Sequence, residues 1–125
     1  MTFVRYESPD VNGHGAHTGV FGLTNGLARS GALSEVDRRW WRAANDWYDA
    51  AYPDPAMVDP SLFDRSVHPV TSCWFRTSAV HLLSRVGGYL DLLDRYGVSW
   101  LERRVDLLTA PVLYEDEVQV VIAGC

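Results

Sequence analysis

The sequence predicts an α+β protein, with a small, mainly antiparallel sheet and about three helices packed on one face, as a single domain over residues 1–125. Three observations support this fold class. Short stretches rich in β-branched and aromatic residues occur near both ends and in the middle of the chain. Apolar side chains recur at helical spacing between them, and turns containing Gly or Pro separate the segments. The order strand, helix, helix, strand, helix, strand, strand suits helices packed against a sheet.

The first strand is expected over Phe3–Tyr6, where Val and aromatic residues alternate with Arg, and it ends at Ser8-Pro9-Asp10. The Gly-rich segment Asn12–Gly19 has no periodicity and is typical of a shaped or mobile loop. From Val20 the apolar pattern becomes helical, and Ser30-Gly31 ends the helix.

The second helix is expected to begin after Ser34, a good N-cap, and to continue to about Ala51. Tyr52-Pro53-Asp54-Pro55 ends it, because a residue before Pro disfavours helical backbone. A long, Pro-rich connection then reaches His68-Pro69, and connections of this length in small domains are often functional. The apolar face of the helix is formed by Val36, Trp40, Ala43, Trp47 and Ala51, widened by Trp41, Ala44 and Tyr48.

In the second half, the pattern predicts a strand over Val70–Arg76 and a helix over Ala79–Tyr96 with a kink at Gly87-Gly88. A further strand is expected over Val98–Val105. Val112–Ala123 forms either one long strand or a hairpin that turns near Glu115-Asp116. Only the two strands that flank the helix 79–96 could form a parallel crossover.

Composition excludes several functions. The chain has eleven Arg and no Lys, so it cannot form a lysine Schiff base, anchor pyridoxal phosphate or build a Walker-type phosphate loop. A net charge of −5 argues against a nucleic-acid-binding protein. We expect no membrane association and a cytoplasmic location, since no signal-like or membrane-spanning stretch is present and the two cysteines form no disulfide framework.

His14 and His17 are the first candidate catalytic residues, because imidazole transfers protons near neutral pH and the Gly-rich backbone around them can approach a ligand closely. A solvated polar loop is the alternative. A metal site would need further ligands from His68, His81, Cys73 or a carboxylate, all distant in sequence, and we expect no metal.

The segment Tyr114–Glu117 holds the third candidate catalytic residue, Asp116. Strand alternation places Tyr114 and Asp116 on one face, and Tyr114 is a candidate substrate contact. A half-buried carboxylate there either pairs with Arg or has a raised pKa suited to proton transfer. The alternative is a charged hairpin turn that keeps an exposed edge from aggregating.

Arg76, His68 and Trp74 complete the candidate substrate-binding residues. The planar guanidinium of Arg76 suits a carboxylate or phosphate, although Arg76 equally suits a structural pair with Asp116 or Glu117. Cys73 is expected to be an inert core thiol.

Three motifs carry a resemblance: Gly19-Val20-Phe21-Gly22, Trp74-Phe75-Arg76, and the segment from Tyr114 to Val120. Together they resemble a group of small bacterial proteins, in an actinobacterial style in which Arg replaces Lys. The resemblance covers most of the chain and implies a single intact domain, and it assigns no catalytic residue.

These observations suggest a small ligand- or peptide-binding tailoring protein, with a cofactor-independent acid–base enzyme as its catalytic form. Arg76 would hold an anionic group while His14 or His17 and Asp116 move protons. One concrete version is a peptide cross-link-forming enzyme of the lysinoalanine type, where an amine adds to an alkene. The alternative is a protein-interaction module, such as an inhibitor or immunity-like partner. A weaker alternative is a nucleic-acid-linked regulator that uses Arg38, Arg39 and Arg42. A homodimer is expected, because the aromatic helix or an exposed edge strand offers a self-complementary surface.

Overall fold

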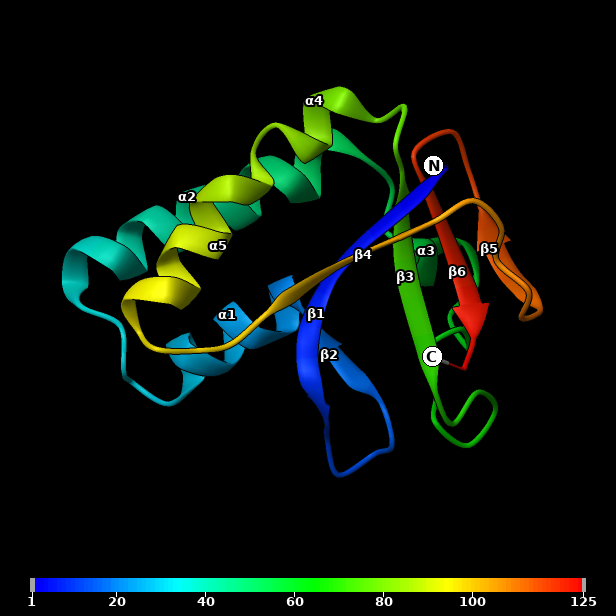
Figure 1. Ribbon diagram of the computed structural model, residues 1–125, viewed down its shortest axis with the longest axis horizontal. Helices are drawn as coiled ribbons and strands as arrows, with labels where there is room; N and C mark the ends of the chain where they lie inside the picture. Colours follow the sequence, from blue (N-terminus) through cyan, green and yellow to red (C-terminus); the bar gives the residue numbers. More distant parts are fainter. Residues whose placement is uncertain (1, 125) are drawn as a thin grey trace.

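The computed structural model describes residues 2–124 and has the expected α+β architecture, with an antiparallel sheet beside a group of helices (Figure 1). The strands are β1 (Phe3–Val11), β2 (His17–Gly19), β3 (Thr71–Arg76), β4 (Leu101–Val105), β5 (Val112–Glu115) and β6 (Gln119–Ala123). The helices are α1 (Val20–Arg29), α2 (Glu35–Ala51), α3 (Pro55–Val58), α4 (Val80–Leu83) and α5 (Val86–Arg95).

The strands form one sheet in the order β2-β1-β3-β6-β5, and β4 pairs with β1. Each pairing among the described residues is antiparallel. The parallel crossover that the sequence allowed between β3 and β4 does not form among the described residues. β4 pairs with β1, with Val105 opposite Phe3, and does not lie beside β3.

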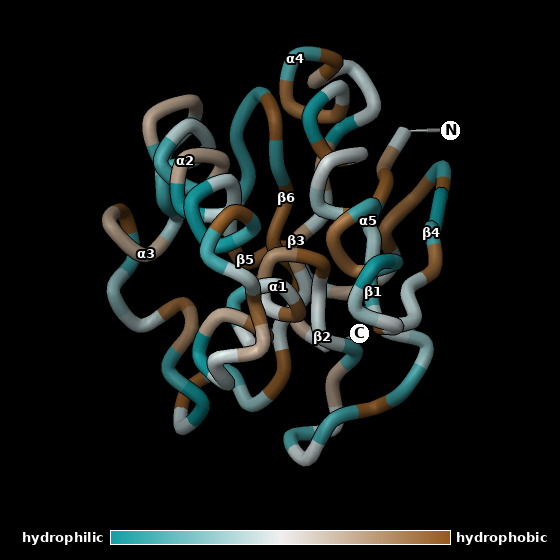
Figure 2. Tube along the Cα trace, turned by 90° about the vertical axis from the view of Figure 1, so that its left-hand side faces the viewer, coloured by the Kyte–Doolittle hydropathy of each residue, from teal (hydrophilic) through white to brown (hydrophobic). Residues whose placement is uncertain are grey.

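Each face of the sheet carries its own apolar cluster. The main core lies between sheet and helices and includes Leu82, Tyr89 and Leu92, all fully buried. A smaller cluster on the opposite face joins Trp74 to Val120 and Ile122. In Figure 2, β6 is largely hydrophobic, whereas much of α2 is hydrophilic, as expected for a buried strand and a helix with one face in water.

The β1–β2 hairpin corrects the prediction for the N-terminal region. The strand does not end at Ser8-Pro9-Asp10 but continues to Val11, because β2 forms from residues expected to be a loop and pairs with it. Only the tip between the two strands is irregular. Asn12 closes this tip, since its Oδ1 accepts hydrogen bonds from the backbone N–H groups of His14 and Ala16.

The buried face of α2 is rotated from the expected one. Trp41 and Tyr48 are buried, whereas Val36 is 75% exposed and Trp40 38% exposed. Hydrogen bonds fix this orientation: Trp41 Nε1 donates to Asn25 Oδ1 at 3.0 Å, and the Tyr48 hydroxyl donates to the Leu82 carbonyl at 2.7 Å.

The helix expected over residues 79–96 consists of α4 and α5, and the break lies at Ser84 and Arg85. Gly87 and Gly88, where the sequence predicted a kink, lie inside α5 and not at this break. The Trp40 ring packs directly against Gly88, so a Cβ at that position would force the ring to move. No helix in the described part of the chain is long and apolar enough to cross a membrane.

Candidate functional site

The sheet forks beside β1. Phe3 and Val4 of β1 pair with β3, but from Glu7 onward the same edge of β1 pairs with β2. Arg5 bridges the fork: its guanidinium donates to the Cys73 carbonyl on β3 at 2.9 Å and to the His17 carbonyl on β2 at 2.7 Å. The fork therefore has a fixed width at Arg5.

A pocket of about 500 Å³ opens where the fork meets the helices. It lies between the start of α1, the end of α2, the connection after α2 and the strands β1 and β3. Four of its aromatic rings form a closed circle of edge contacts, in the order Phe21, Tyr48, Tyr52 and Phe75, with centroid distances from 4.9 to 6.3 Å. Phe63 also lines the pocket. Such a wall suits an apolar or aromatic group of a ligand.

The long connection after α2 is held to the sheet by Gln119. Its Nε2 donates to the Pro53 carbonyl at 2.8 Å and to Asp116 Oδ2 at 2.9 Å. Asp54 caps α3 by accepting from the Ala56 N–H at 2.9 Å. These contacts order the pocket wall formed by residues 52–55.

Two polar groups in the pocket are kept neutral by their surroundings. Burial raises the pKa of Tyr52 well above its ordinary value, and no group in the described residues forms a hydrogen bond with its hydroxyl. Cys73 is exposed within the pocket and not in the core as expected, yet the protein atoms around it raise the pKa of its thiol. Tyr52 is therefore available as a neutral donor, and Cys73 is a weak nucleophile at neutral pH.

The charge at the pocket is negative. Asp49 and Asp54 line it and are exposed, and neither forms an ion pair with an arginine of the described residues. Arg5, the cation of the pocket, is paired with Glu7, since its Nε donates to Glu7 Oε1 at 2.9 Å. A ligand group with positive charge is therefore favoured at the mouth.

Glu7 is the centre of a buried polar cluster behind Arg5. Its side chain is 3% exposed, and besides Arg5 it lies 3.5 Å from Arg103 Nη1 and 3.6 Å from His17 Nδ1. Two arginines, Arg5 on the same strand and Arg103 on β4, compensate for the desolvation of this carboxylate. The cluster positions Arg5 and thereby the fork.

The predicted catalytic residues do not meet in one cavity. His14 is exposed at the hairpin tip, and His17 contacts Glu7 and the Ser8 carbonyl. Asp116 lies in the turn between β5 and β6. Burial acts to raise its pKa, but hydrogen bonds from Gln119, the Val118 N–H and Tyr114 outweigh this and lower it. Asp116 thus has the hydrogen bonds of a turn-forming carboxylate.

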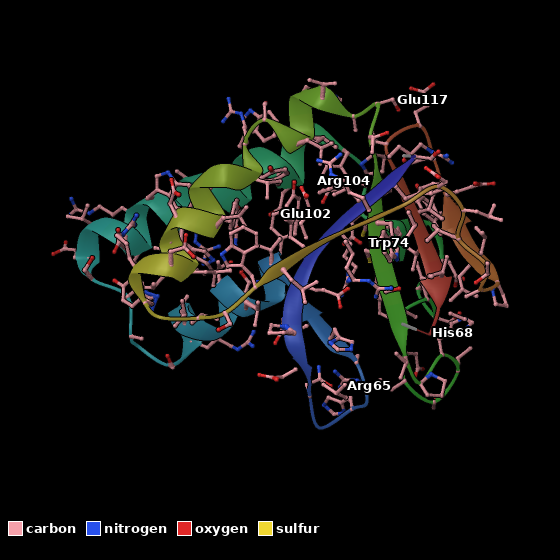
Figure 3. The ribbon with its side chains drawn as sticks, in the orientation of Figure 1. Arg65, His68, Trp74, Glu102, Arg104 and Glu117 are labelled. Atoms are coloured by element: carbon pink, nitrogen blue, oxygen red, sulfur yellow. The ribbon has the colours of Figure 1, made fainter. Side chains whose placement is uncertain are left out.

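The predicted substrate contacts are also dispersed. Arg76 donates to the backbone carbonyl of Asp116 and to the carboxylate of Glu115. It therefore forms a structural ion pair, but with Glu115 and not with the side chain of Asp116 or Glu117. Tyr114 donates to Asp116. Figure 3 shows His68 at one end of the sheet and Glu117 at the other. Trp74 alone of the seven candidate residues borders the pocket, although its ring packs in the smaller cluster.

Among the described residues, no group of three or more His, Cys, Asp or Glu side chains is arranged to hold a metal ion. The pocket residues that sequence reasoning missed are Arg5, Tyr52, Asp49, Asp54 and Gln119. The sequence did contain one indication of this site. Arg5 and Glu7 are two residues apart in a strand, so their opposite charges lie on the same face of the sheet. The fork that brings β3 to Arg5 has no local sequence signal.

The chain was compared with protein-family models, with curated proteins and with solved structures, and none of them matches it. The resemblance of its three motifs to small bacterial proteins therefore stays a prediction.

Proposed function

We propose that the protein binds a small molecule or peptide segment in the ring-lined pocket, with an apolar or aromatic group against the rings and an amino group at the mouth. The observation that carries this proposal is the pocket itself: about 500 Å³, with a circle of four rings and two unpaired carboxylates. A cavity of this size that combines apolar walls with a few polar groups is typical of a ligand site.

A set of three matched probes tests this proposal. Tyramine, 4-ethylphenol and 3-(4-hydroxyphenyl)propionate share a phenol ring and differ in charge. We expect saturable binding of tyramine, weaker binding of the neutral probe, and an affinity for the anion at least about tenfold below that of tyramine. Isothermal titration calorimetry measures all three affinities.

A blocking variant localises the binding. Cys73→Trp fills the pocket from β3 and should abolish tyramine binding, whereas Val80→Trp adds the same bulk at an exposed site on α4 and should not. Circular dichroism checks that both variants fold. Absence of binding by every probe, or a preference for the anion, would overturn the proposal.

The catalytic form of the proposal is the addition of an amine to an alkene, as in lysinoalanine cross-links. Asp49 or Asp54 takes a proton from the ammonium group, and the amine nitrogen forms a bond to the terminal alkene carbon. Tyr52 donates a proton to the adjacent carbon and regains one from the carboxylic acid through water. No cofactor is needed, since protons and electrons balance.

A peptide with one lysine and one dehydroalanine tests this step. Addition consumes the thiol-reactive alkene without a change in mass, so loss of thiol labelling over time measures the rate. Tyr52→Phe should slow the reaction by about two orders of magnitude. A rate equal to that of the peptide without protein would leave binding as the only function of the pocket.

A protein-interaction role is the second candidate. Next to the pocket, the connection after α2 exposes Met57 by 83%, Val58 by 67% and Val67 by 52%. Apolar side chains exposed together mark a contact surface for a partner chain. The double variant Met57→Ser/Val58→Ser should weaken a peptide or protein partner while tyramine still binds, and unchanged partner binding would exclude this surface.

A further inference from the structure

A second concave surface lies between the end of α1 and the middle of α2. It is a hollow of about 410 Å³, and its polar lining consists of Arg29, Arg38, Arg42, Asn25 and Asn45, beside Trp41. We call it the arginine groove. In a chain of net charge −5, no Asp or Glu among the described residues lines it.

The arginines of the groove differ from most other arginines of the chain in having no acidic partner among the described residues. Arg29, Arg38 and Arg42 are exposed, and none of them pairs with a carboxylate of the described residues. Six of the other eight arginines do form such pairs. Three neighbouring guanidinium groups repel one another, so an anion between them is stabilising.

Two of these guanidinium groups are already held in place. Arg38 Nη2 donates to the Ala28 carbonyl at 3.3 Å, and the Arg42 guanidinium lies 4.5 Å from the centre of the Trp41 ring. The floor is also fixed, because Asn25 Oδ1 accepts from both Trp41 and Asn45 at 3.0 Å. Little side-chain entropy is then lost when a ligand binds.

We propose that the arginine groove binds a phosphate or diphosphate group of a small molecule. Guanidinium forks bind such oxyanions in pairs of hydrogen bonds. A nucleic-acid strand fits less well, since a chain with a net charge of −5 disfavours contact with many successive phosphates. This proposal is independent of the ring-lined pocket, which is bordered by none of these residues.

Calorimetric titration with inorganic pyrophosphate at low ionic strength tests the proposal. We expect saturable binding with one site per chain. Arg38→Gln/Arg42→Gln should weaken it by about tenfold or more. Arg39→Gln is the matched control, because it removes a neighbouring exposed charge that pairs with Glu35, and its effect should stay below about twofold.

Arg29→Gln provides a second variant should the double variant fail to fold, and it should weaken binding severalfold. No saturable binding by the wild type, or an equal loss in Arg39→Gln, would overturn the proposal. Tighter binding of a single-stranded oligonucleotide than of pyrophosphate would replace the small anion with a nucleic acid as the ligand.

Discussion

The two ends of the α1–α2 helix pair carry surfaces of opposite character. The start of α1 and the end of α2 contribute Phe21 and Asp49 to a pocket with unpaired carboxylates. The end of α1 and the middle of α2 contribute Arg29 and Arg42 to a groove with unpaired arginines. The two surfaces differ in how their arginines are paired. Arg5 of the pocket forms an ion pair with Glu7, whereas the arginines of the groove form no ion pair with a carboxylate of the described residues. Residue type alone therefore does not identify an anion site.

The largest effect is expected from Glu7→Gln, which would leave Arg5 without its buried partner. Removing one member of a buried ion pair costs about 3–5 kcal/mol, because the remaining charge stays desolvated. Glu35→Gln breaks an exposed pair with Arg39 and should cost less than about 1 kcal/mol. Urea unfolding measures both changes. Equal losses would show that Glu7 is not the anchor of the fork.

Asp116→Asn should have the next largest effect, because Asp116 holds Gln119 in the pocket wall. The loss of charged hydrogen bonds should cost about 1–2 kcal/mol near pH 7. Since the pKa of Asp116 is lowered below 3.8 in the folded chain, its contribution is complete above that pH and is lost as the pH falls through the folded pKa. The difference between wild type and variant should shrink below pH 3.8 in chemical unfolding. If the stability difference between wild type and variant stayed the same at all pH values, the lost stability would come from packing and not from the charge of Asp116.

Asp49→Asn/Asp54→Asn tests the charge of the pocket directly. We expect tyramine affinity to fall by about tenfold and 4-ethylphenol affinity to stay the same, because only the amine interacts with the carboxylates. Pyrophosphate binding should not change by more than about twofold, since the groove lies apart from these residues. Calorimetry resolves all three, and an equal loss for the neutral phenol would point to an altered pocket shape.

The smallest effect concerns Cys73, measured in a Cys125→Ser background. Its raised pKa predicts slow alkylation by iodoacetamide at pH 7, with a rate that still increases above pH 9.0, the ordinary pKa of the thiol. Saturating tyramine should slow the reaction severalfold, and pyrophosphate should not. N-acetylcysteine serves as the reference thiol. A reaction faster than the reference would mean that the thiolate is stabilised in the pocket.

Local patterns predicted the fold better than the site. The cap at Ser34 and the stop at Tyr52-Pro53 placed α2, and the hairpin was one of two alternatives for the C-terminal strands. The pocket depends instead on pairings between distant residues, such as Arg5 with Cys73 and Gln119 with Pro53. No periodicity encodes these contacts.

The chemistry of imidazole made His14 and His17 predicted catalytic residues, yet neither side chain lines the pocket. From the sequence, the arginines of α2 supported only a weaker nucleic-acid-binding alternative. The packing of α1 beside them adds Arg29 and forms a groove. In both cases the neighbour across the fold, and not the residue itself, decides the environment.

If the ring-lined pocket and the arginine groove are independent sites of opposite charge preference, ¹H–¹⁵N NMR with tyramine and pyrophosphate added in turn will separate them. Tyramine should shift the backbone amides of Phe21 and Cys73 and leave the Trp41 indole N–H unchanged. Pyrophosphate should shift the Trp41 indole and the Arg38 and Arg42 side chains, whether or not tyramine is bound. Shifts of the same residues by both probes, or displacement of one by the other, would show that the two sites are not independent.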